Sequence, residues 1–332
     1  MTAYERVLVI GAGSWGTALA ALCARAGRRT TIWSRGEAVA EQLRGGENAR
    51  YLPDIALPDA LAVTTDRAAA READALLLVV PAQAARGEAV ALREATDGAA
   101  LPVALCCKGI EQETGLLMHQ VLAEAWPEAR GAVLSGPSFA ADVARGLPTA
   151  VTLADEDEAR GERWLATVAT DAFRPYYSSD VLGAELGGAI KNVLAIACGV
   201  VEGRGLGESA KAALMARGFA EARRFALGLG ARPETLSGLS GLGDLILTCS
   251  SRQSRNMSLG YEMGQGRSAA DIIAERRTVS EGAATAPILV RLARGRGVEM
   301  PVSEAVCALV EGRVSVDEAI RDLMTRPLRI EG

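Results

Sequence analysis

Histidine and lysine are the two residue types that this sequence of 332 residues nearly lacks. It has one histidine, His119, and three lysines, Lys108, Lys191 and Lys211, against 33 arginines, which are its 36 basic residues less the lysines. His119 lies in an amphipathic helical pattern, so we expect it at the surface or at a helix cap rather than in catalysis. Because a guanidinium does not release its proton at useful pH, proton transfer points to the rare lysines.

The six cysteines lack the spacing of a disulfide framework or a zinc site. They stand at positions 23, 106, 107, 198, 249 and 307, two of them adjacent, and no two form a C-x-x-C pair. Such a distribution is typical of neither class of site and indicates a reducing compartment. We therefore expect a cytoplasmic protein without a bound metal.

An excess of basic charge, a long apolar run, internal repeats and low-complexity linkers are also missing. The formal net charge is −5, with 23% charged and 49% hydrophobic residues, which is ordinary for a globular enzyme and offers nucleic acid no basic surface. The longest apolar run, near residues 75–82, is far too short to cross a bilayer, and the chain passes from Glu5 directly into a strand pattern. We expect neither a secretion signal nor membrane insertion.

What is present is glycine in an informative pattern. Residues 6–20 read RVLVIGAGSWGTALA, an apolar run followed by Gly11, Gly13 and Gly16 in G-x-G-x-x-G spacing and then a helix-forming stretch. In such a strand, turn and helix the first glycine permits a sharp turn, the second lets the backbone approach a pyrophosphate, and the third lets the helix pack on the strand. The pattern predicts a bound dinucleotide, although methyltransferase loops and plain structural corners share it.

Strand patterns alternate with helical ones through the first half of the chain. We expect strands at 7–10, 30–33, 62–64, 75–80, 103–106, 132–134, 149–153 and 173–177. Alternation of this kind indicates a parallel, doubly wound α/β sheet. Helices follow, expected at 182–201, 209–227, 269–276, 286–294, 302–311 and 316–324. The predicted organisation is a dinucleotide-binding domain, 1–178, and an all-α domain, 179–332.

Cofactor choice depends on the residue at the end of the second strand. An acidic residue there holds the ribose 2′-hydroxyl of NAD, whereas an arginine accommodates the 2′-phosphate of NADP. Here Thr30–Trp33 is followed by Ser34 and Arg35, with no Asp or Glu at the tip. The sequence predicts that NADP is accepted, unless Arg35 is one more solvated arginine.

Lys191 has the most favourable setting for proton transfer. It follows Gly187 and Gly188 by four and three positions and precedes Ala195 by four, so helical spacing puts small residues on its side. Apolar surroundings, and a second lysine if one is near, would lower its pKa from about 10.4 toward the working range. The alternative is a salt-bridged or snorkelling lysine with glycines that serve packing.

Further polar clusters stand where ligands bind in open α/β sheets or in loops. Lys108 follows the strand 103–106 at its carboxyl end, and the SGPSFA segment, 135–140, follows the next strand. In the helical half, 241–244 and 250–256 concentrate Gly, Asp, Ser, Arg and Asn, which we expect in a loop. Ordinary turns and solvated side chains are the alternatives for each.

Seven segments together resemble one family. In their order and in the length of chain that they span, these segments resemble those of the bacterial NAD(P)-dependent glycerol-3-phosphate dehydrogenases. They are GAGSWGTALA, CCKGIE, SGPSFA, GGAIKNVLAIACG, GLGDLILTC, SRN and SEG. The resemblance implies a Rossmann domain followed by an all-α domain like that of 6-phosphogluconate dehydrogenase. It also implies reversible hydride transfer between NAD(P)H and dihydroxyacetone phosphate, giving sn-glycerol 3-phosphate for glycerophospholipid synthesis. The implied partner is a phosphorylated small molecule, and a homodimer is left open.

The resemblance assigns roles motif by motif, and Lys191 takes the position of the family's proton acceptor. The implied cofactor contacts are Gly11, Gly13, Ser14, Trp15, Gly16, Arg35, Lys108, Ala140, Arg255, Val279 and Glu281. The implied substrate contacts are Lys108, Gly136, Ser138, Lys191, Asp244, Ser254, Arg255 and Asn256.

The sequence departs from the family pattern at two places. Ser280 stands where a second valine is frequent, and Glu208-Ser209 stands where an asparagine often precedes the position of Lys211. Both leave the reaction intact and put only the surroundings of the site in doubt. Two other functions stay open: a related dehydrogenase of a β-hydroxyacid or sugar acid, and a dinucleotide sensor without catalysis.

Overall fold

The computed structural model describes residues 2–276 and 279–327, which belong to two compact units. The first unit comprises Met1–Gly188 and Glu234–Asp244, and the second comprises Ala189–Pro233 and Leu245–Gly332. The predicted division at residue 178 falls on the last residue of the sheet and stays a prediction about where the domains separate.

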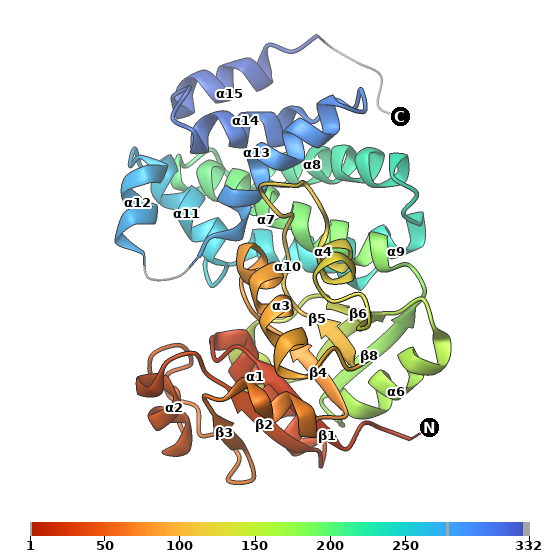
Figure 1. Ribbon diagram of the computed structural model, residues 1–332. Coiled ribbons are helices and arrows are strands. Elements are labelled where there is room, and N and C mark those ends of the chain that lie inside the picture. Colours follow the sequence, from red (N-terminus) through yellow and green to blue (C-terminus); the bar gives the residue numbers. More distant parts are fainter. Residues whose placement is uncertain (1, 277–278, 328–332) are drawn as a thin grey trace. The chain divides into compact units, whose positions relative to one another are not determined.

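The first unit is built on an eight-stranded sheet (Figure 1). Its strands are β1 (Arg6–Ile10), β2 (Arg29–Trp33), β3 (Ala62–Thr64), β4 (Ala75–Leu78), β5 (Pro102–Leu105), β6 (Arg130–Ser135), β7 (Thr149–Ala154) and β8 (Phe173–Ser178). They pair in the order β3-β2-β1-β4-β5-β6-β7-β8. All eight strands predicted from the sequence are present, which confirms the doubly wound α/β class.

One strand pair differs from the predicted parallel arrangement, because β7 runs antiparallel to β6. The connection between them contains a single helix of six residues, α5 (Ala140–Arg145). Such a helix is about 9 Å long, less than half the length of a six-residue strand. It therefore cannot carry the chain back along the sheet, as a parallel crossover requires.

Helices cover both faces of the sheet because alternate strand residues point to opposite sides. Val7 and Val9 of β1 belong to one buried cluster, which includes residues of α1, α5 and α6. Leu8 and Ile10 belong to the other, which includes residues of α3 and α4. Besides α5, the helices of this region are α1 (Ser14–Arg25), α2 (Glu37–Arg44), η1 (Arg67–Glu72), η2 (Ala82–Ala84), α3 (Ala85–Ala95), α4 (Met118–Ala125) and α6 (Glu158–Val168).

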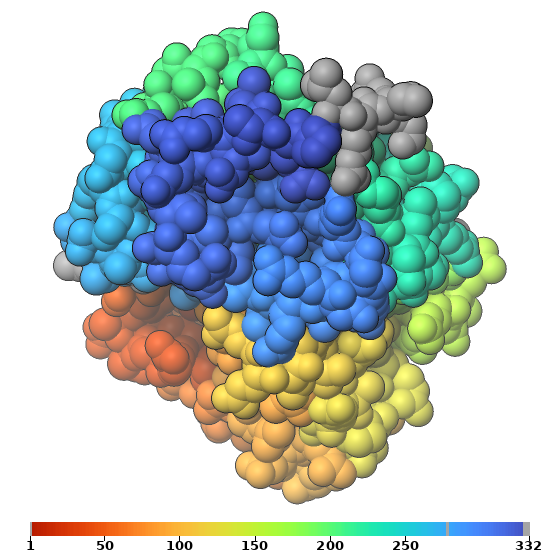
Figure 2. Space-filling view, turned by 90° about the horizontal axis from the view of Figure 1, so that it is seen from above, coloured from red at the N-terminus to blue at the C-terminus, as the bar shows by residue number. Residues whose placement is uncertain are grey.

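The second half of the chain is helical, as predicted, and none of the described residues after Ser178 forms a strand. Its helices are α7 (Val181–Gly203), α8 (Glu208–Gly228), α9 (Pro233–Ser237), η3 (Leu239–Gly243), α10 (Asp244–Ser250), α11 (Arg255–Gly264), α12 (Ala269–Glu275), α13 (Glu281–Arg294), α14 (Pro301–Val310) and α15 (Val316–Met324). Figure 2 shows the outer surface that α13 to α15 give the second unit, in blue.

Residues 241–244 and 250–256 were expected in a loop, and that prediction was wrong except at 251–254. A π-helical turn, η3, leads directly into α10, and only residues 251–254 form the turn before α11. The glycines that suggest a loop are needed for close packing: a Cβ on Gly241 would lie 1.9 Å from the carbonyl oxygen of Leu236. Glycine therefore marks a tight backbone approach here rather than a flexible connection.

Two helices of the second unit cross backbone to backbone. Gly199 and Gly203 of α7 face α11, and Gly260 and Gly264 of α11 face α7. A Cβ on any of the four would lie 1.9–2.5 Å from a backbone oxygen of the other helix. Because a side chain at any of these positions would force the helices apart, the glycines fix the distance between α7 and α11.

The helix α7 is long and apolar enough to cross a membrane by length and composition, with a mean hydropathy of 1.5. However, 94% of its most apolar window is buried inside the structure. Such burial is typical of a core helix, which explains its composition.

Candidate functional site

The glycine loop that follows β1 has the geometry of a dinucleotide cradle. Gly11 has a φ of +116°, and a Cβ there would lie 2.3 Å from the carbonyl oxygen of Val79. A Cβ on Gly16 would lie 1.7 Å from the carbonyl oxygen of Gly11. Gly13 is the N-cap of α1, and no atom lies within 4 Å of the position of its Cβ. The first and third glycines are thus required by the fold, and the second leaves open space at the helix N-terminus.

That N-terminus fits a phosphate group. Among the described residues no side chain caps α1, and its first turn contains no acidic residue. Its helix dipole and first-turn amides are therefore oriented for an anion, which is the role they play in dinucleotide folds. Ser14 donates its hydroxyl to the carbonyl oxygen of Tyr51 over 2.6 Å, so a contact from Ser14 to a phosphate would come from its backbone N–H.

Arg35 is exposed immediately after β2, and it forms no ion pair with any described residue. The adjacent Ser34 turns its hydroxyl to the carbonyl oxygen of Gly36 over 2.9 Å. The strand end therefore presents a guanidinium and no carboxylate. This arrangement suits a 2′-phosphate better than a free 2′-hydroxyl.

Four of the predicted substrate residues form one hydrogen-bonded cluster in the first unit. The Nζ of Lys108 lies 2.7 Å from Oδ2 of Asp244 and 3.2 Å from the carbonyl oxygen of Gly136. Ser138 donates its hydroxyl to the same carbonyl over 3.1 Å. Asp244 is 1% exposed, so the ion pair places a lysine amine in a defined direction at the carboxyl end of β5.

The small residues expected to leave room beside Lys191 instead serve other contacts. A Cβ on Gly188 would lie 2.9 Å from Oγ of Ser135 and 3.4 Å from the side chain of Lys108. A Cβ on Gly187 would lie 2.4 Å from the carbonyl oxygen of Ser240. The first turns of α7 thus make room for the Lys108 cluster.

The loop that carries Lys108 is anchored by a neighbouring helix. Arg86 of α3 forms a bidentate pair with Glu111, at 2.9 and 2.8 Å. The hydrogen bond from Arg86 is the main cause that lowers the pKa of Glu111 below its ordinary value. Gln83 donates to the carbonyl oxygen of Ile110 over 2.8 Å. The KGIE segment is therefore held at its far end, three residues from the amine.

In the second unit, Lys191 projects from α7 toward α10. Its Nζ donates to Oγ1 of Thr248 over 2.8 Å. The two residues are 9% and 4% exposed. This bond holds a buried lysine amine, a group that can exchange a proton, in a defined direction.

Asn256 and Asn192 connect three helices near Lys191. Asn256 donates its amide to Oδ1 of Asn192 over 3.0 Å and accepts the N–H of Gly282 over 2.9 Å. A Cβ on Gly282 would lie 2.4 Å from the carbonyl oxygen of Asn192. The side chain of Asn256, predicted to contact substrate, thus holds α7, α11 and the start of α13 together.

The remaining predicted contacts stand at helix N-termini. Ser254 caps α11 by accepting the N–H of Met257, and Arg255 is the first residue of that helix. Desolvation lowers the pKa of Arg255, and the negative charge of Glu281 opposes this effect. Glu281 begins α13 and Ala140 begins α5, while Val279 is 44% exposed just before α13.

Comparison with known proteins identifies the family. Family models described as the N-terminus and C-terminus of NAD-dependent glycerol-3-phosphate dehydrogenase match residues 6–160 and 180–321. The glycerol-3-phosphate dehydrogenases, NAD(P)+, of Parvibaculum lavamentivorans and Maricaulis maris are each 55% identical to the chain, covering 99% and 100% of it and 99% of their own length. The chain belongs to the NAD(P)-dependent glycerol-3-phosphate dehydrogenase family.

A solved structure agrees with this assignment. Glycerol-3-phosphate dehydrogenase from Coxiella burnetii superposes with a TM-score of 0.92 at 35% identity, over 97% of this chain and 99% of that one. The protein is therefore an oxidoreductase that uses NAD or NADP and has the fold of glycerol-3-phosphate dehydrogenases.

The two other rare basic residues have structural partners in this glycerol-3-phosphate dehydrogenase. Lys211 pairs with Glu202 over 2.7 Å, and Arg252 approaches the same carboxylate over 3.2 Å. His119 is half-buried in α4 and pairs with Glu185, which also accepts its backbone N–H. His119 is thus partly exposed and ion-paired, and it stands outside the polar clusters as expected. No metal-binding group of three or more His, Cys, Asp or Glu residues occurs in the described chain.

Two residues that hydrogen-bond to predicted parts of the site were missed from the sequence: Thr248, which accepts from Lys191, and Asn48, which donates to the carbonyl of Ala12 in the glycine loop. Thr248 lies inside the apolar segment LILTC, where a threonine indicates a residue of the packed core. Asn48 lies in a polar loop that contains no known motif. The only signal for Thr248 was its spacing of four from Asp244, which places both on one side of α10. Nothing distinguishes Asn48 in the sequence.

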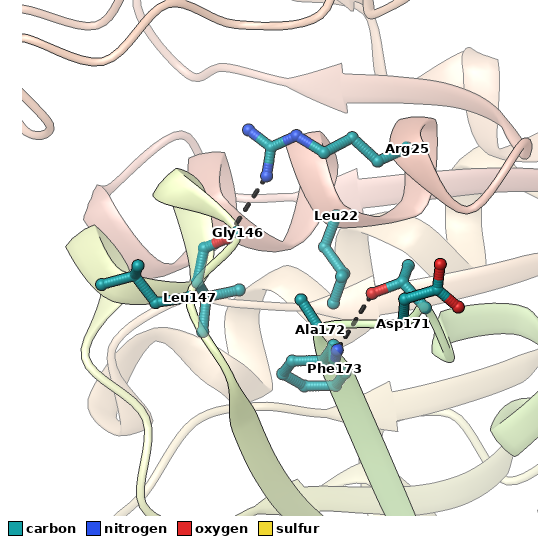
Figure 3. A pocket seen from close by; sticks show the side chains of 9 residues that line it. Leu22, Arg25, Gly146, Leu147, Asp171, Ala172 and Phe173 are labelled. Atoms are coloured by element: carbon teal, nitrogen blue, oxygen red, sulfur yellow. Dashed lines mark hydrogen bonds between the residues drawn. The ribbon is translucent and has the colours of Figure 1, made fainter.

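A pocket of about 230 Å³ is lined by residues of α1 and α5, by the connections before β7 and β8, and by the start of β8, none of which is a predicted site residue. Figure 3 shows Arg25, the last residue of α1, reaching across it to the end of α5. The Arg25 guanidinium donates to the carbonyl oxygen of Val143 over 3.3 Å. Leu22 and Phe173 form an apolar wall.

Proposed function

We propose that this enzyme works mainly as a reductase, converting dihydroxyacetone phosphate to sn-glycerol 3-phosphate for glycerophospholipid synthesis. The observation that carries the proposal is Lys191, a buried lysine whose amine is bound to the neutral hydroxyl of Thr248. NAD(P)H, when bound, supplies the hydride that reduces the C2 carbonyl of the substrate.

The proton that completes the reduction comes from Lys191 in this proposal. Hydride addition leaves negative charge on the substrate oxygen, and the ammonium of Lys191 donates a proton to it and becomes a neutral amine. In the oxidative direction the same amine removes the hydroxyl proton. Thr248 supports both forms, because its hydroxyl accepts from an ammonium and can donate to an amine.

Substrate binding is proposed for the polar clusters of each unit. Lys108 contributes a directed N–H donor rather than net positive charge, because Asp244 balances its charge at 2.7 Å. Arg255 and the capped N-terminus of α11 supply a guanidinium and helix dipole for the phosphate. Gly136, Ser138, Ser254 and Asn256 stay proposed contacts on the strength of their motifs.

Cofactor contacts are likewise proposed residue by residue. The cradle of Gly11, Gly13 and Gly16 and the start of α1 would hold the pyrophosphate, and Arg35 would pair with a 2′-phosphate. We therefore propose that NADPH is the preferred reductant. Trp15, Lys108, Ala140, Arg255, Val279 and Glu281 are the other proposed contacts.

We place the enzyme in the cytoplasm, in line with six cysteines that are all free and buried. The size of its assembly stays open, with a homodimer as the hypothesis. Its proposed partners are small phosphorylated molecules, not nucleic acid.

A steady-state assay with purified protein tests the function. We expect the enzyme to oxidise NADPH in the presence of dihydroxyacetone phosphate, which is measured by the loss of NADPH absorbance. The kcat/KM with NADPH should exceed that with NADH. At neutral pH, the kcat/KM for reduction of dihydroxyacetone phosphate should exceed that for oxidation of sn-glycerol 3-phosphate. Reduction of a β-keto acid in preference to the phosphorylated ketose would favour the related-dehydrogenase alternative. Cofactor binding without turnover on any substrate would favour a sensor.

A further inference from the structure

A buried asparagine, outside the glycine motif, forms hydrogen bonds with the glycine loop that follows β1 and with the start of α1. Asn48 lies in the connection between α2 and β3 and is 0% exposed. Its Nδ2 donates to the carbonyl oxygen of Ala12 over 3.1 Å and lies 2.8 Å from Oγ1 of Thr17. Ala12 is the residue between the first two glycines, and Thr17 is in the first turns of α1.

The orientation of the Asn48 amide is determined by chemistry. The carbonyl of Ala12 can only accept a hydrogen bond, so the atom facing it must be the NH₂ group. The other end of the amide, Oδ1, is buried and has no hydrogen-bond partner among the described residues. A buried polar atom without a partner costs free energy. The hydrogen bonds of the NH₂ group to the loop must therefore offset the cost of burying Oδ1.

The hydrogen bond from Asn48 to the Ala12 carbonyl also fixes the direction of the N–H group of Gly13. In a planar trans peptide the C=O of one residue and the N–H of the next point in opposite directions. Because Asn48 binds the carbonyl of Ala12, the N–H of Gly13 points away from Asn48, and this N–H donates to no described residue. Gly13 is also the position whose Cβ would meet open space.

The segment that carries Asn48 is itself fastened to the loop. The backbone N–H groups of Tyr51 and Leu52 both donate to the carbonyl oxygen of Asn48, over 3.1 and 2.7 Å. Ser14 then donates its hydroxyl to the carbonyl of Tyr51. The two connections restrain a loop whose three glycines would otherwise leave it with large conformational entropy.

We propose that Asn48 is a positioning residue for the cofactor: it fixes the Ala12–Gly13 peptide so that the Gly13 N–H is preorganised for the pyrophosphate. This inference deepens the cofactor half of the proposed function. Preorganisation of this kind lowers the entropic cost of binding and leaves the chemical step unchanged once cofactor is bound.

The isosteric variant Asn48→Asp tests the proposal, because it puts a carboxylate oxygen where the NH₂ group faces the Ala12 carbonyl. We expect the Kd for NADPH, measured by fluorescence titration of the enzyme without substrate, to rise by about tenfold or more, which is the effect of losing one buried hydrogen bond and leaving its partner unpaired. The kcat at saturating NADPH and the KM for dihydroxyacetone phosphate should stay within about twofold of the parent.

Gln42→Glu is the matched control, since it makes the same amide-to-acid change at a nearby site. Gln42 accepts the backbone N–H of Arg50 through Oε1, which a glutamate retains. The Kd of the Gln42→Glu variant for NADPH should equal that of the parent. Asn48→Ser, a smaller donor, should recover part of the affinity lost in Asn48→Asp.

An unchanged Kd for NADPH in folded Asn48→Asp would overturn the assignment, and so would an equal loss in Gln42→Glu. If Asn48→Asp does not fold, Asn48→Ala decides, because it removes the NH₂ group without adding a charge: weaker NADPH binding with unchanged kcat at saturation supports the proposal, and parent-like binding rejects it. Failure of the parent enzyme to bind NADPH at all would overturn both this inference and the proposed use of the cofactor.

Discussion

The Nζ of Lys191 lies 2.8 Å from Oγ1 of Thr248, and this bond joins the middle of α7 to α10. Neither residue is more than 9% exposed. A hydroxyl partner restricts the rotamers of the long lysine side chain. The pair therefore combines positioning with a group that can change its protonation state.

Replacing Lys191 by alanine should lower kcat by at least about a hundredfold, the lower end of the range for a general acid or base. Lys191→Arg should fail to a similar degree, because a guanidinium at the same place keeps its charge but cannot give up its proton. NADPH titration should show that both variants still bind cofactor. Near-normal turnover of either would remove Lys191 from the role of proton donor.

Much of the first unit could be predicted from the sequence, because its signals are local. Short strand-forming runs that alternate with helical patterns indicate the strands of an α/β sheet, and all eight strands were predicted in this way. The turn role of Gly11 and the packing role of Gly16 were predicted correctly, because each meets a requirement that only glycine satisfies. Lys108 was placed at a strand end, where open α/β sheets bind ligands.

The parts that could not be predicted depend on contacts between distant segments. The pairing of Lys108 with Asp244 joins residues that are 136 positions apart, and that of His119 with Glu185 joins residues 66 apart. The glycines near 241 suggested a loop because glycine disfavours helix, yet close packing with Leu236 overrides that preference. Local patterns contain no information on such partners.

Arg35→Ala should raise the Kd for NADPH by about tenfold and leave the Kd for NADH within about twofold, since only NADPH has a 2′-phosphate to lose its charge-assisted bond. Arg29→Ala is the matched control, because Arg29 is exposed at the other end of the same strand. Isothermal titration with each dinucleotide measures both constants. Equal losses for the two cofactors would contradict the 2′-phosphate assignment.

Gly260→Ala should impair the second unit through its packing. The new Cβ would lie 1.9 Å from the carbonyl oxygen of Ile196 on α7, so the helices must separate. We expect destabilisation by about 1–3 kcal/mol in urea unfolding and a higher KM for dihydroxyacetone phosphate, because α11 carries Arg255 at its start.

The control for this change is Gly228→Ala, at the end of α8, where no atom lies within 4 Å of the added Cβ. This variant should be as stable as the parent or slightly more stable, since alanine has the higher helix propensity. If both variants lost stability equally, the cause would be the loss of a glycine and not the helix crossing.

The pair of His119 and Glu185 predicts a pH-dependent contribution to stability. Burial alone would lower the pKa of His119, but the hydrogen bond and charge of Glu185 outweigh it and raise the pKa above its ordinary value. Because the pKa of His119 is higher in the folded than in the unfolded state, its protonation adds to the free energy of unfolding. This contribution is complete below the unfolded pKa of about 6.5 and is lost as the pH rises through the folded pKa.

His119→Gln should therefore lower Tm relative to the parent most at about pH 5.5 and least at about pH 8.5. Because the pair is only partly buried, we expect a loss on the order of 1 kcal/mol at the lower pH, or about 2–4 °C. Glu185→Gln should remove most of the same pH-dependent difference, although it also weakens the acceptor for the N–H of His119. A Tm difference between parent and His119→Gln that stayed constant from pH 5.5 to 8.5 would show that the imidazolium charge contributes nothing and that the residue stabilises α4 by packing alone.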